Sequence, residues 1–193
     1  AERVNIVESQ VLSQDWYLLK KITFDYLRNN GEWQRQTREV YDRGNGAAIL
    51  LFNRERKTVV LTRQFRLPVF VNGHDGLLIE VAAGLLEGAA PEERIRDEAE
   101  EETGYRVHHV QKVFEAYMSP GSVTEKLHFF IAEYDASAKV SEGGGLEEET
   151  EELEVLEWSF ADALAAFDRG EICDAKTIML LQYAAMKNIF TAI

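Results

Sequence analysis

The chain has 193 residues, 46% of them hydrophobic and 28% charged, which is the composition of one folded domain or of a domain with a small appendage. The formal net charge of −13 opposes binding to nucleic acids and anionic membranes, because affinity for a polyanion comes mainly from lysine and arginine. The single cysteine, Cys173, excludes an intramolecular disulfide, and the apolar runs are too short for a membrane helix. We therefore expect a cytoplasmic protein that has no nucleic-acid or membrane partner and needs a metal ion to handle phosphates.

The first half of the chain predicts β-structure. Residues 4–43 alternate in polarity and contain many aromatic and β-branched residues, with a turn at 29–31, which predicts an antiparallel β-hairpin. Further strands are expected over 47–53 and 58–63. Pro91 suits a first helical position and Gly104 suits a C-terminal cap, so a helix is expected between them.

The second half of the chain is expected to contain both strands and helices. Strands are expected over 105–117 and 126–134, then a glycine-rich loop at 141–145, an acidic run and a strand near 153–158. Apolar residues at helical spacing predict two closing helices, over 160–167 and 177–189. Strands flanked by helices give an α+β or α/β sandwich. We expect residues 1–43 to form an N-terminal β region and residues 44–193 to form the catalytic domain.

Three glutamates share one face of the helix expected after Pro91. Glu98 and Glu102 are four residues apart, and Glu101 lies beside them, so their carboxylates should converge. Like charges at this spacing destabilise a helix by roughly 0.2–0.5 kcal/mol per pair, and the cluster therefore calls for a cation. Hard oxygen ligands suit Mg²⁺ or Mn²⁺. The alternative is a solvated acidic face, which is the commoner meaning of a charged run.

Residues 84–105 resemble the Nudix box, G-x5-E-x7-R-E-U-x-E-E-x-G-U, where U is aliphatic. The residues that match its helical half are Glu98, Glu101, Glu102 and Gly104. The loop after Gly84 is one residue short, with Ala90 at the place of the loop glutamate and Asp97 at the place of the arginine. Asp97 removes a cation that helps to hold the acidic cluster, so we expect weaker or shifted metal affinity. Either Glu92 or Glu93 replaces the loop glutamate, or both interact with the helix dipole.

The resemblance to the Nudix hydrolases implies an α+β fold, namely an α/β/α sandwich with a mixed sheet and an N-terminal antiparallel β-hairpin region. It also implies that Mg²⁺, with Mn²⁺ as a substitute, assists hydrolysis of a pyrophosphate bond. The implied metal ligands are the Ala83 carbonyl, Glu98, Glu101, Glu102 and Glu151. Glu102 and Glu151 would be catalytic, with Glu151 binding metal or acting as general base. The choice among the acids of the run 147–152 stays open.

Segments outside the box resemble the GDP-mannose pyrophosphatase subfamily most, with the ADP-ribose pyrophosphatases as neighbours. They are residues 38–46, 63–66, 117–121, 143–145 and 170–176. The substrate-binding residues implied are Trp16, Arg38, Glu39, Arg66, Gly84, Leu85, Glu125 and Lys176. Arginine suits phosphate because its guanidinium offers two parallel donors, and Trp16 or Tyr17 would stack on a nucleobase. The alternatives are surface ion pairs for the charged residues and core packing for the aromatic ones.

The expected reaction is hydrolysis of a nucleoside diphosphate sugar, most simply GDP-mannose to GMP and mannose 1-phosphate. ADP-ribose hydrolysis to AMP and ribose 5-phosphate is the close alternative. A catalytically weak nucleotide-binding module is a second alternative, which the replacements at positions 90 and 97 favour. The subfamily also implies a homodimer with exchanged domains, formed through the N-terminal β region.

Overall fold

A computed structural model describes residues 3–146 and 152–191 of the chain. The chain divides into two compact units, which we describe separately. Residues 1–45 and 117–126 make the N-terminal unit, and residues 46–116 and 127–193 make the main unit. No helix in the described residues is long and apolar enough to cross a membrane.

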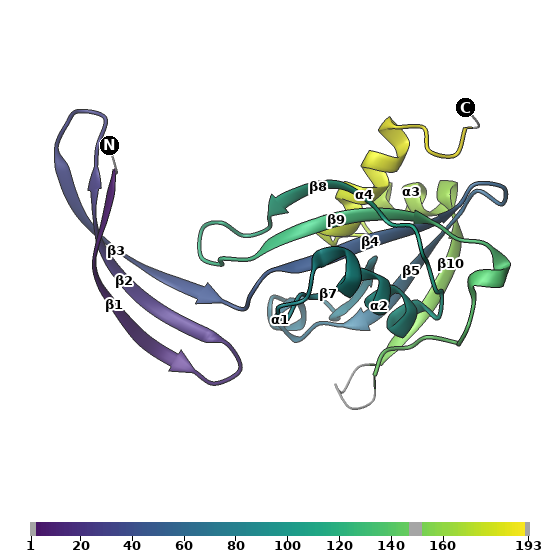
Figure 1. The fold of residues 1–193 in the computed structure, drawn as a ribbon, viewed down its shortest axis with the longest axis horizontal. Helices are drawn as coiled ribbons and strands as arrows, with labels where there is room; N and C mark the ends of the chain where they lie inside the picture. Colours follow the sequence, from purple (N-terminus) through teal and green to yellow (C-terminus); the bar gives the residue numbers. More distant parts are fainter. Residues whose placement is uncertain (1–2, 147–151, 192–193) are drawn as a thin grey trace. The chain divides into compact units, whose positions relative to one another are not determined.

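The N-terminal unit is a three-stranded antiparallel sheet, drawn in purple in Figure 1. Its strands, in spatial order, are β1 (Val4–Gln14), β2 (Leu18–Leu27) and β3 (Trp33–Asp42). The predicted hairpin turn at 29–31 joins β2 to β3, with Gly31 at a φ of 86°. The turn before β2 was not predicted, because Asp15, Trp16 and Tyr17 include no glycine or proline to mark it.

The main unit contains a seven-stranded mixed sheet, which confirms the predicted fold class. The spatial order is β10-β5-β4-β9-β8, with β6 pairing to β5 and β7 pairing to β4. β4 and β9 run parallel, whereas β4 is antiparallel to β5 and β7. The strands are β4 (Gly46–Asn53), β5 (Thr58–Phe65), β6 (Leu77–Glu80), β7 (Ala82–Leu85), β8 (Gln111–Tyr117), β9 (Lys126–Glu133) and β10 (Leu153–Ser159).

Helices cover both faces of this sheet (Figure 1). Helix α2 (Pro91–Thr103) lies on one face, while α3 (Phe160–Asp168) and α4 (Ala175–Met186) lie on the other. All eight residues of β4 are buried, and alternate ones serve opposite layers. Ile49 packs in one core cluster with Ile95 of α2, whereas the Phe52 ring meets Phe190 at 5.8 Å. Each fully buried aliphatic side chain contributes about 1.5–3 kcal/mol, so this strand anchors the unit.

Several element boundaries differ from the prediction. The strand expected from Tyr105 begins at Gln111, because Tyr105 and Val107 turn into the core and Tyr105 makes only an isolated bridge. Helix α1 (Leu67–Val71) and the 3-10 turn Ala136–Ala138 were not predicted, since neither is long enough to show a helical period. Strands β6 and β7, on either side of Val81, were not predicted, and they pair with different neighbours, β5 and β4.

Helix α2 occupies the predicted bounds, from Pro91 to Thr103. Gly104 ends it with a left-handed φ of 78°, and its amide donates to the Glu100 carbonyl at 2.9 Å. A side chain at Gly104 would also collide with the Ser141 backbone, so glycine is required there for two reasons. The helix is thereby held at its C-terminal end by the loop that approaches β10.

Candidate active site

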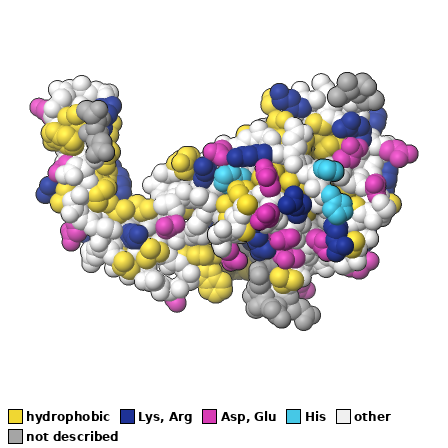
Figure 2. Space-filling view, viewed as in Figure 1, with side chains coloured by type: hydrophobic (Ala, Val, Ile, Leu, Met, Phe, Trp, Pro, Cys, Tyr) yellow, Lys and Arg dark blue, Asp and Glu magenta, His cyan; other side chains and the backbone are white. Residues whose placement is uncertain are grey.

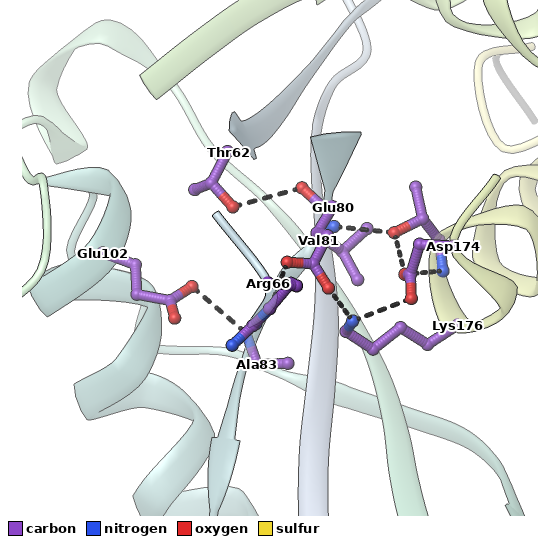
Figure 3. Close-up of polar contacts among 9 residues, drawn as sticks. Thr62, Arg66, Glu80, Val81, Ala83, Glu102, Asp174 and Lys176 are labelled. Atoms are coloured by element: carbon purple, nitrogen blue, oxygen red, sulfur yellow. Dashed lines mark hydrogen bonds and ion pairs between the residues drawn. The ribbon is translucent and has the colours of Figure 1, made fainter. Parts of the chain in front are cut away.

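The acidic face of α2 points into the main unit at β7. The side chains of Glu98 and Glu102 are nearly inaccessible, with residue exposures of 5% and 3%. The Glu102 carboxylate accepts a hydrogen bond from the Ala83 amide at 3.2 Å (Figure 3). A Cβ built on Gly84 would lie 1.7 Å from Oε1 of Glu98, so only glycine leaves room for that carboxylate. The helix and the strand therefore fit together through two buried carboxylates.

Arg94 supplies positive charge beside these acids. Its guanidinium lies 2.6 Å from Oε1 of Glu98 and 3.4 Å from Oε2 of Glu101, and it also donates to the Leu85 carbonyl at 3.2 Å. Asp97, by contrast, is exposed. Arg94, one turn before Glu98, therefore supplies a cation to the cluster although position 97 does not. The sequence contains a signal for this ion pair, because Arg94 precedes Glu98 by four residues and side chains at that spacing are neighbours on a helix.

The first turn of α2 carries Glu92 and Glu93, the two candidates to replace the loop glutamate. Ala90 is the N-cap residue and makes no side-chain capping bond, while Glu92 and Glu93 are exposed. Acidic residues in a first turn favourably meet the positive end of the helix dipole. Figure 2 shows acidic and basic side chains interspersed over this face of the main unit, not segregated into one patch.

A second polar cluster surrounds Glu80, at the end of β6 (Figure 3). Glu80 is 3% exposed, and its two oxygens accept from different cations. Oε2 meets Nε of Arg66 at 2.8 Å, and Oε1 meets Nζ of Lys176 at 2.5 Å. Lys176 also donates to Asp174 at 3.0 Å. Arg66 and Lys176, both predicted to bind substrate, are therefore brought together by an acid that the sequence analysis did not single out.

Burial and charge act in opposite directions on the two cations. Burial lowers the pKa of Lys176, but the carboxylates of Glu80 and Asp174 outweigh it and hold that pKa above 10.5. Burial likewise lowers the pKa of Arg66, and attraction to Glu80, with smaller help from Glu102, raises it above its usual value. Both groups are therefore charged throughout the neutral range.

The cluster is completed by the N-terminus of α4. Asp174 is the N-cap residue, and its Oδ2 accepts from the Thr177 amide at 3.0 Å and from the Thr177 hydroxyl at 2.6 Å. The same hydroxyl oxygen accepts from the Val81 amide at 2.9 Å. Thr177 thus links α4 to the residue between β6 and β7, which fixes Lys176 relative to Glu80.

The loop after Ser141 is attached to the C-terminal end of α2. The Gly144 amide donates to the Glu102 carbonyl at 2.9 Å, and the Gly145 amide donates to the Glu101 carbonyl at 3.2 Å. The Leu153 amide returns to the Gly144 carbonyl at 3.1 Å. Glu151, predicted as a metal ligand and base, lies outside the described residues, as do Glu147, Glu148 and Glu149.

The remaining predicted residues lie in the N-terminal unit. Arg38 and Glu39 line a cavity of about 490 Å³ that is walled mainly by apolar side chains. Glu125 lies 3.6 Å from Arg43, whose guanidinium sits over the ring of Tyr17. Trp16 is 81% exposed and packs edge-on against Tyr17, so it is not a core residue.

The donor set on α2 fits a hard divalent cation. Glu98 and Glu102 are buried carboxylates on one face of a rigid helix, and the Ala83 amide of β7 donates to Glu102. In the residues that the structure describes, no three acidic, histidine or cysteine side chains converge as a complete metal site. Glu101 is instead paired with Arg94. Further oxygen ligands would come from backbone, substrate or water, as is usual for Mg²⁺.

Comparison with known proteins matches both parts of the chain to family profiles. The profile described as the GDP-mannose pyrophosphatase NudK N-terminal domain matches residues 3–41, and the NUDIX domain profile matches residues 42–181. A GDP-mannose pyrophosphatase of Pectobacterium atrosepticum is 56% identical over 188 residues, covering 97% of this chain and 96% of that protein. The protein of that name from Salmonella typhimurium is 55% identical over 190 residues, covering 98% of each.

Among solved structures, a crystal structure described as an ADP compounds hydrolase is similar in fold. Its TM-score is 0.75 at 15% sequence identity, and the match covers 96% of both chains. At that identity the likeness concerns the fold alone.

Proposed function

The chain belongs to the NUDIX family, and from that membership we propose that it is a metal-dependent hydrolase that converts GDP-mannose to GMP and mannose 1-phosphate. The observation that carries the proposal is the identity of about 55% to GDP-mannose pyrophosphatases over nearly the whole chain. The geometry agrees with it, since Glu98 and Glu102 are both buried and Gly84 leaves space for the Glu98 carboxylate.

Mg²⁺ is the proposed cofactor, with Mn²⁺ as a substitute, and its proposed ligands are the Ala83 carbonyl, Glu98, Glu101, Glu102 and Glu151. Bound there, it would neutralise charge on the phosphoryl oxygens and lower the pKa of a bound water. Arg94 holds Glu98 and Glu101 in place through its two contacts. We assign the catalytic roles to Glu102, as a ligand, and to Glu151, as a ligand or general base.

The proposed contacts to the diphosphate are Arg66 and Lys176, together with backbone at Gly84 and Leu85. The side chain of Arg66 is 36% exposed and contacts Glu80 through Nε, and within the described residues its two Nη groups donate no hydrogen bond. Two parallel N–H donors match the spacing of phosphate oxygens. Arg66 is therefore suited to orient the diphosphate before water attacks phosphorus.

For the nucleoside or sugar we propose Trp16, Arg38, Glu39 and Glu125. The cavity lined by Arg38 and Glu39 combines apolar walls with two charged residues, as small-molecule sites commonly do. The exposed indole of Trp16 is free to stack on a base, since a base presents its π-face to any aromatic ring.

We also propose a homodimer in the cytoplasm, formed through residues 1–43, with residues 44–193 as the catalytic domain. All eleven residues of β1 are exposed, and β1 is an edge strand of its sheet. Several of them are large and apolar, namely Val4, Ile6, Val7, Val11 and Leu12. An exposed apolar edge strand is a template for pairing with another chain.

A substrate panel tests the proposed reaction. The purified protein is incubated with Mg²⁺ and, separately, GDP-mannose, GDP-glucose, ADP-ribose and UDP-glucose, and the products are separated by anion-exchange chromatography. We expect GMP and mannose 1-phosphate to form fastest. Faster turnover of ADP-ribose would change the substrate assignment, and no turnover of any diphosphate would refute the proposed activity.

A further inference from the structure

Glu80 is a buried carboxylate that is neither a proposed metal ligand nor the proposed general base. It lies at the last position of β6, is 3% exposed, and accepts bonds from cations on two different elements. Arg66 precedes α1 and Lys176 is in the first turn of α4, so the two cations are far apart in the sequence. Charged groups are rarely buried without a partner, and here one acid holds two.

The backbone of Arg66 is fixed, whereas the direction of its guanidinium depends on Glu80. The Arg66 amide donates to the Gly76 carbonyl at 2.7 Å, and the Arg66 carbonyl accepts the first bonds of α1. Beyond Cβ, Glu80 is the residue to which the guanidinium donates. Within the described residues, Nη1 and Nη2 of Arg66 donate no hydrogen bond. The single contact through Nε therefore orients the guanidinium and leaves Nη1 and Nη2 available as donors.

Lys176 is held in a complementary way. Its ammonium donates to Glu80 and to Asp174, and the latter is itself fixed by two bonds from Thr177. Figure 3 shows Glu80 between Arg66 and Lys176, with one oxygen directed to each. Asp174 alone would keep Lys176 charged but would not bring it to Arg66. Glu80 is the group that makes the two cations a pair.

We propose that Glu80 is a positioning residue that presents Arg66 and Lys176 as a single preorganised receptor for the diphosphate group of the substrate. The inference deepens the proposed function and rests on it. Glu80 acts through the two cations and does not contact the reacting atoms. Because the orientation is set before binding, the substrate does not have to order these side chains, and this preorganisation appears as tighter binding.

The test is a kinetic comparison of Glu80→Gln, Arg66→Ala and the double variant, with GDP-mannose as substrate. Glu80→Gln should raise KM by about 10- to 100-fold while kcat falls by no more than a few-fold. In the Arg66→Ala background the same substitution should raise KM less, because one of the two cations that Glu80 positions is gone. Independent, multiplicative effects on KM would overturn the proposal, as would an unchanged KM in Glu80→Gln.

Glu157→Gln is the matched control, since Glu157 also pairs with an arginine, Arg56 at 2.7 Å, and is partly buried. We expect its KM to stay at the wild-type value even when its melting temperature falls. A rise in KM equal to that of Glu80→Gln would mean that KM responds to any loss of stability, and would overturn the positioning role. If Glu80→Gln fails to fold, Glu80→Asp retains the charge but is too short to reach both cations, and it should still raise KM.

Binding of magnesium pyrophosphate, measured by titration calorimetry, separates this inference from the proposed function. A wild-type protein that binds pyrophosphate but hydrolyses no nucleotide sugar would refute the proposed function alone. Pyrophosphate affinity should fall at least about tenfold in Glu80→Gln, while Mn²⁺ affinity without pyrophosphate stays within about twofold. Equal pyrophosphate affinity in wild type and Glu80→Gln would overturn the inference, whatever the outcome of the substrate panel.

Discussion

Gly84 and Glu98 are matched in shape, because the Glu98 carboxylate occupies the volume that a side chain at position 84 would fill. The contact joins β7 to the acidic face of α2 and sets where that carboxylate lies. Gly84 has no left-handed φ, so the requirement for glycine there is one of space alone.

Gly84→Ala should displace Glu98 and lower kcat/KM by about 100-fold, with a parallel loss of Mn²⁺ affinity. Steady-state kinetics and calorimetric titration measure the two effects. Gly88→Ala is the control, because a Cβ at Gly88 would meet open space and the substitution costs only about 1 kcal/mol of left-handed backbone strain. Unchanged metal affinity in Gly84→Ala would separate Glu98 from the metal site.

Glu98→Gln and Glu102→Gln should each abolish saturable Mn²⁺ binding and reduce kcat by more than about 100-fold, since even residues that only support a ligand contribute 10- to 100-fold. Glu100→Gln, on the same helix, removes a carboxylate that pairs with Arg106 near the surface and should leave both quantities unchanged. A Glu102→Gln protein that hydrolysed substrate at the wild-type rate would refute the metal mechanism.

Arg94→Ala should destabilise the metal-free protein by about 3 kcal/mol, because it leaves buried Glu98 without its guanidinium partner. Added Mg²⁺ should restore part of this loss, since a bound cation neutralises the same carboxylates. Urea unfolding with and without Mg²⁺ measures both values, with Arg96→Ala as the control on the same helix. A loss of stability that Mg²⁺ does not reduce would show that Arg94 and the metal serve different groups.

The raised pKa of Lys176 predicts that its contribution to the stability of the protein is lost at alkaline pH. Its pKa in the folded protein is raised above 10.5, so its stabilisation is complete below pH 10.5 and is lost as the pH rises through the folded value. The difference in unfolding free energy between wild type and Lys176→Met should therefore be constant from pH 7 to 9.5 and shrink above pH 10.5. Lys187→Met, at an exposed position after α4, provides the comparison. A difference in unfolding free energy that grew with pH would contradict the predicted direction of the pKa shift of Lys176.

Val11→Lys should shift a dimer toward monomer, because it places a charge on the apolar edge strand β1, where Val11 is 52% exposed. Light scattering after size-exclusion chromatography measures the mass of each variant. Ser9→Lys adds the same charge at a polar position of the same strand and should leave the dimer intact. A wild-type protein that is monomeric at micromolar concentration would refute the proposed dimer.

Local signals in the sequence predicted α2 and its acidic face well. Pro91 and Gly104 bound the helix in the structure as they do in the pattern, and the spacing of Glu98 and Glu102 brings both onto one buried face. The Nudix resemblance, read from the same stretch, is confirmed by the family profile over residues 42–181. The roles of the site residues stay predictions, including that of Glu151.

Contacts between residues that are far apart in the sequence could not be predicted from local sequence patterns. Glu80 reads as one polar residue at the end of an apolar strand, and its partners Arg66 and Lys176 come from other elements. Asp97 stands where the motif has an arginine, but the helix allows Arg94 to meet the same carboxylates from one turn away.

The burial of β4 has a consequence for synthesis on the ribosome. One edge of β4 is covered by β5 and β7, which follow it closely in the chain, but the other edge waits for β9, where Leu127 pairs with Gly46. At roughly 5–20 residues per second, several seconds pass before that partner has been made. During this interval the nascent chain exposes an apolar strand with one unpaired edge. A chain whose translation is arrested before Lys126 would therefore bind a chaperone through that edge.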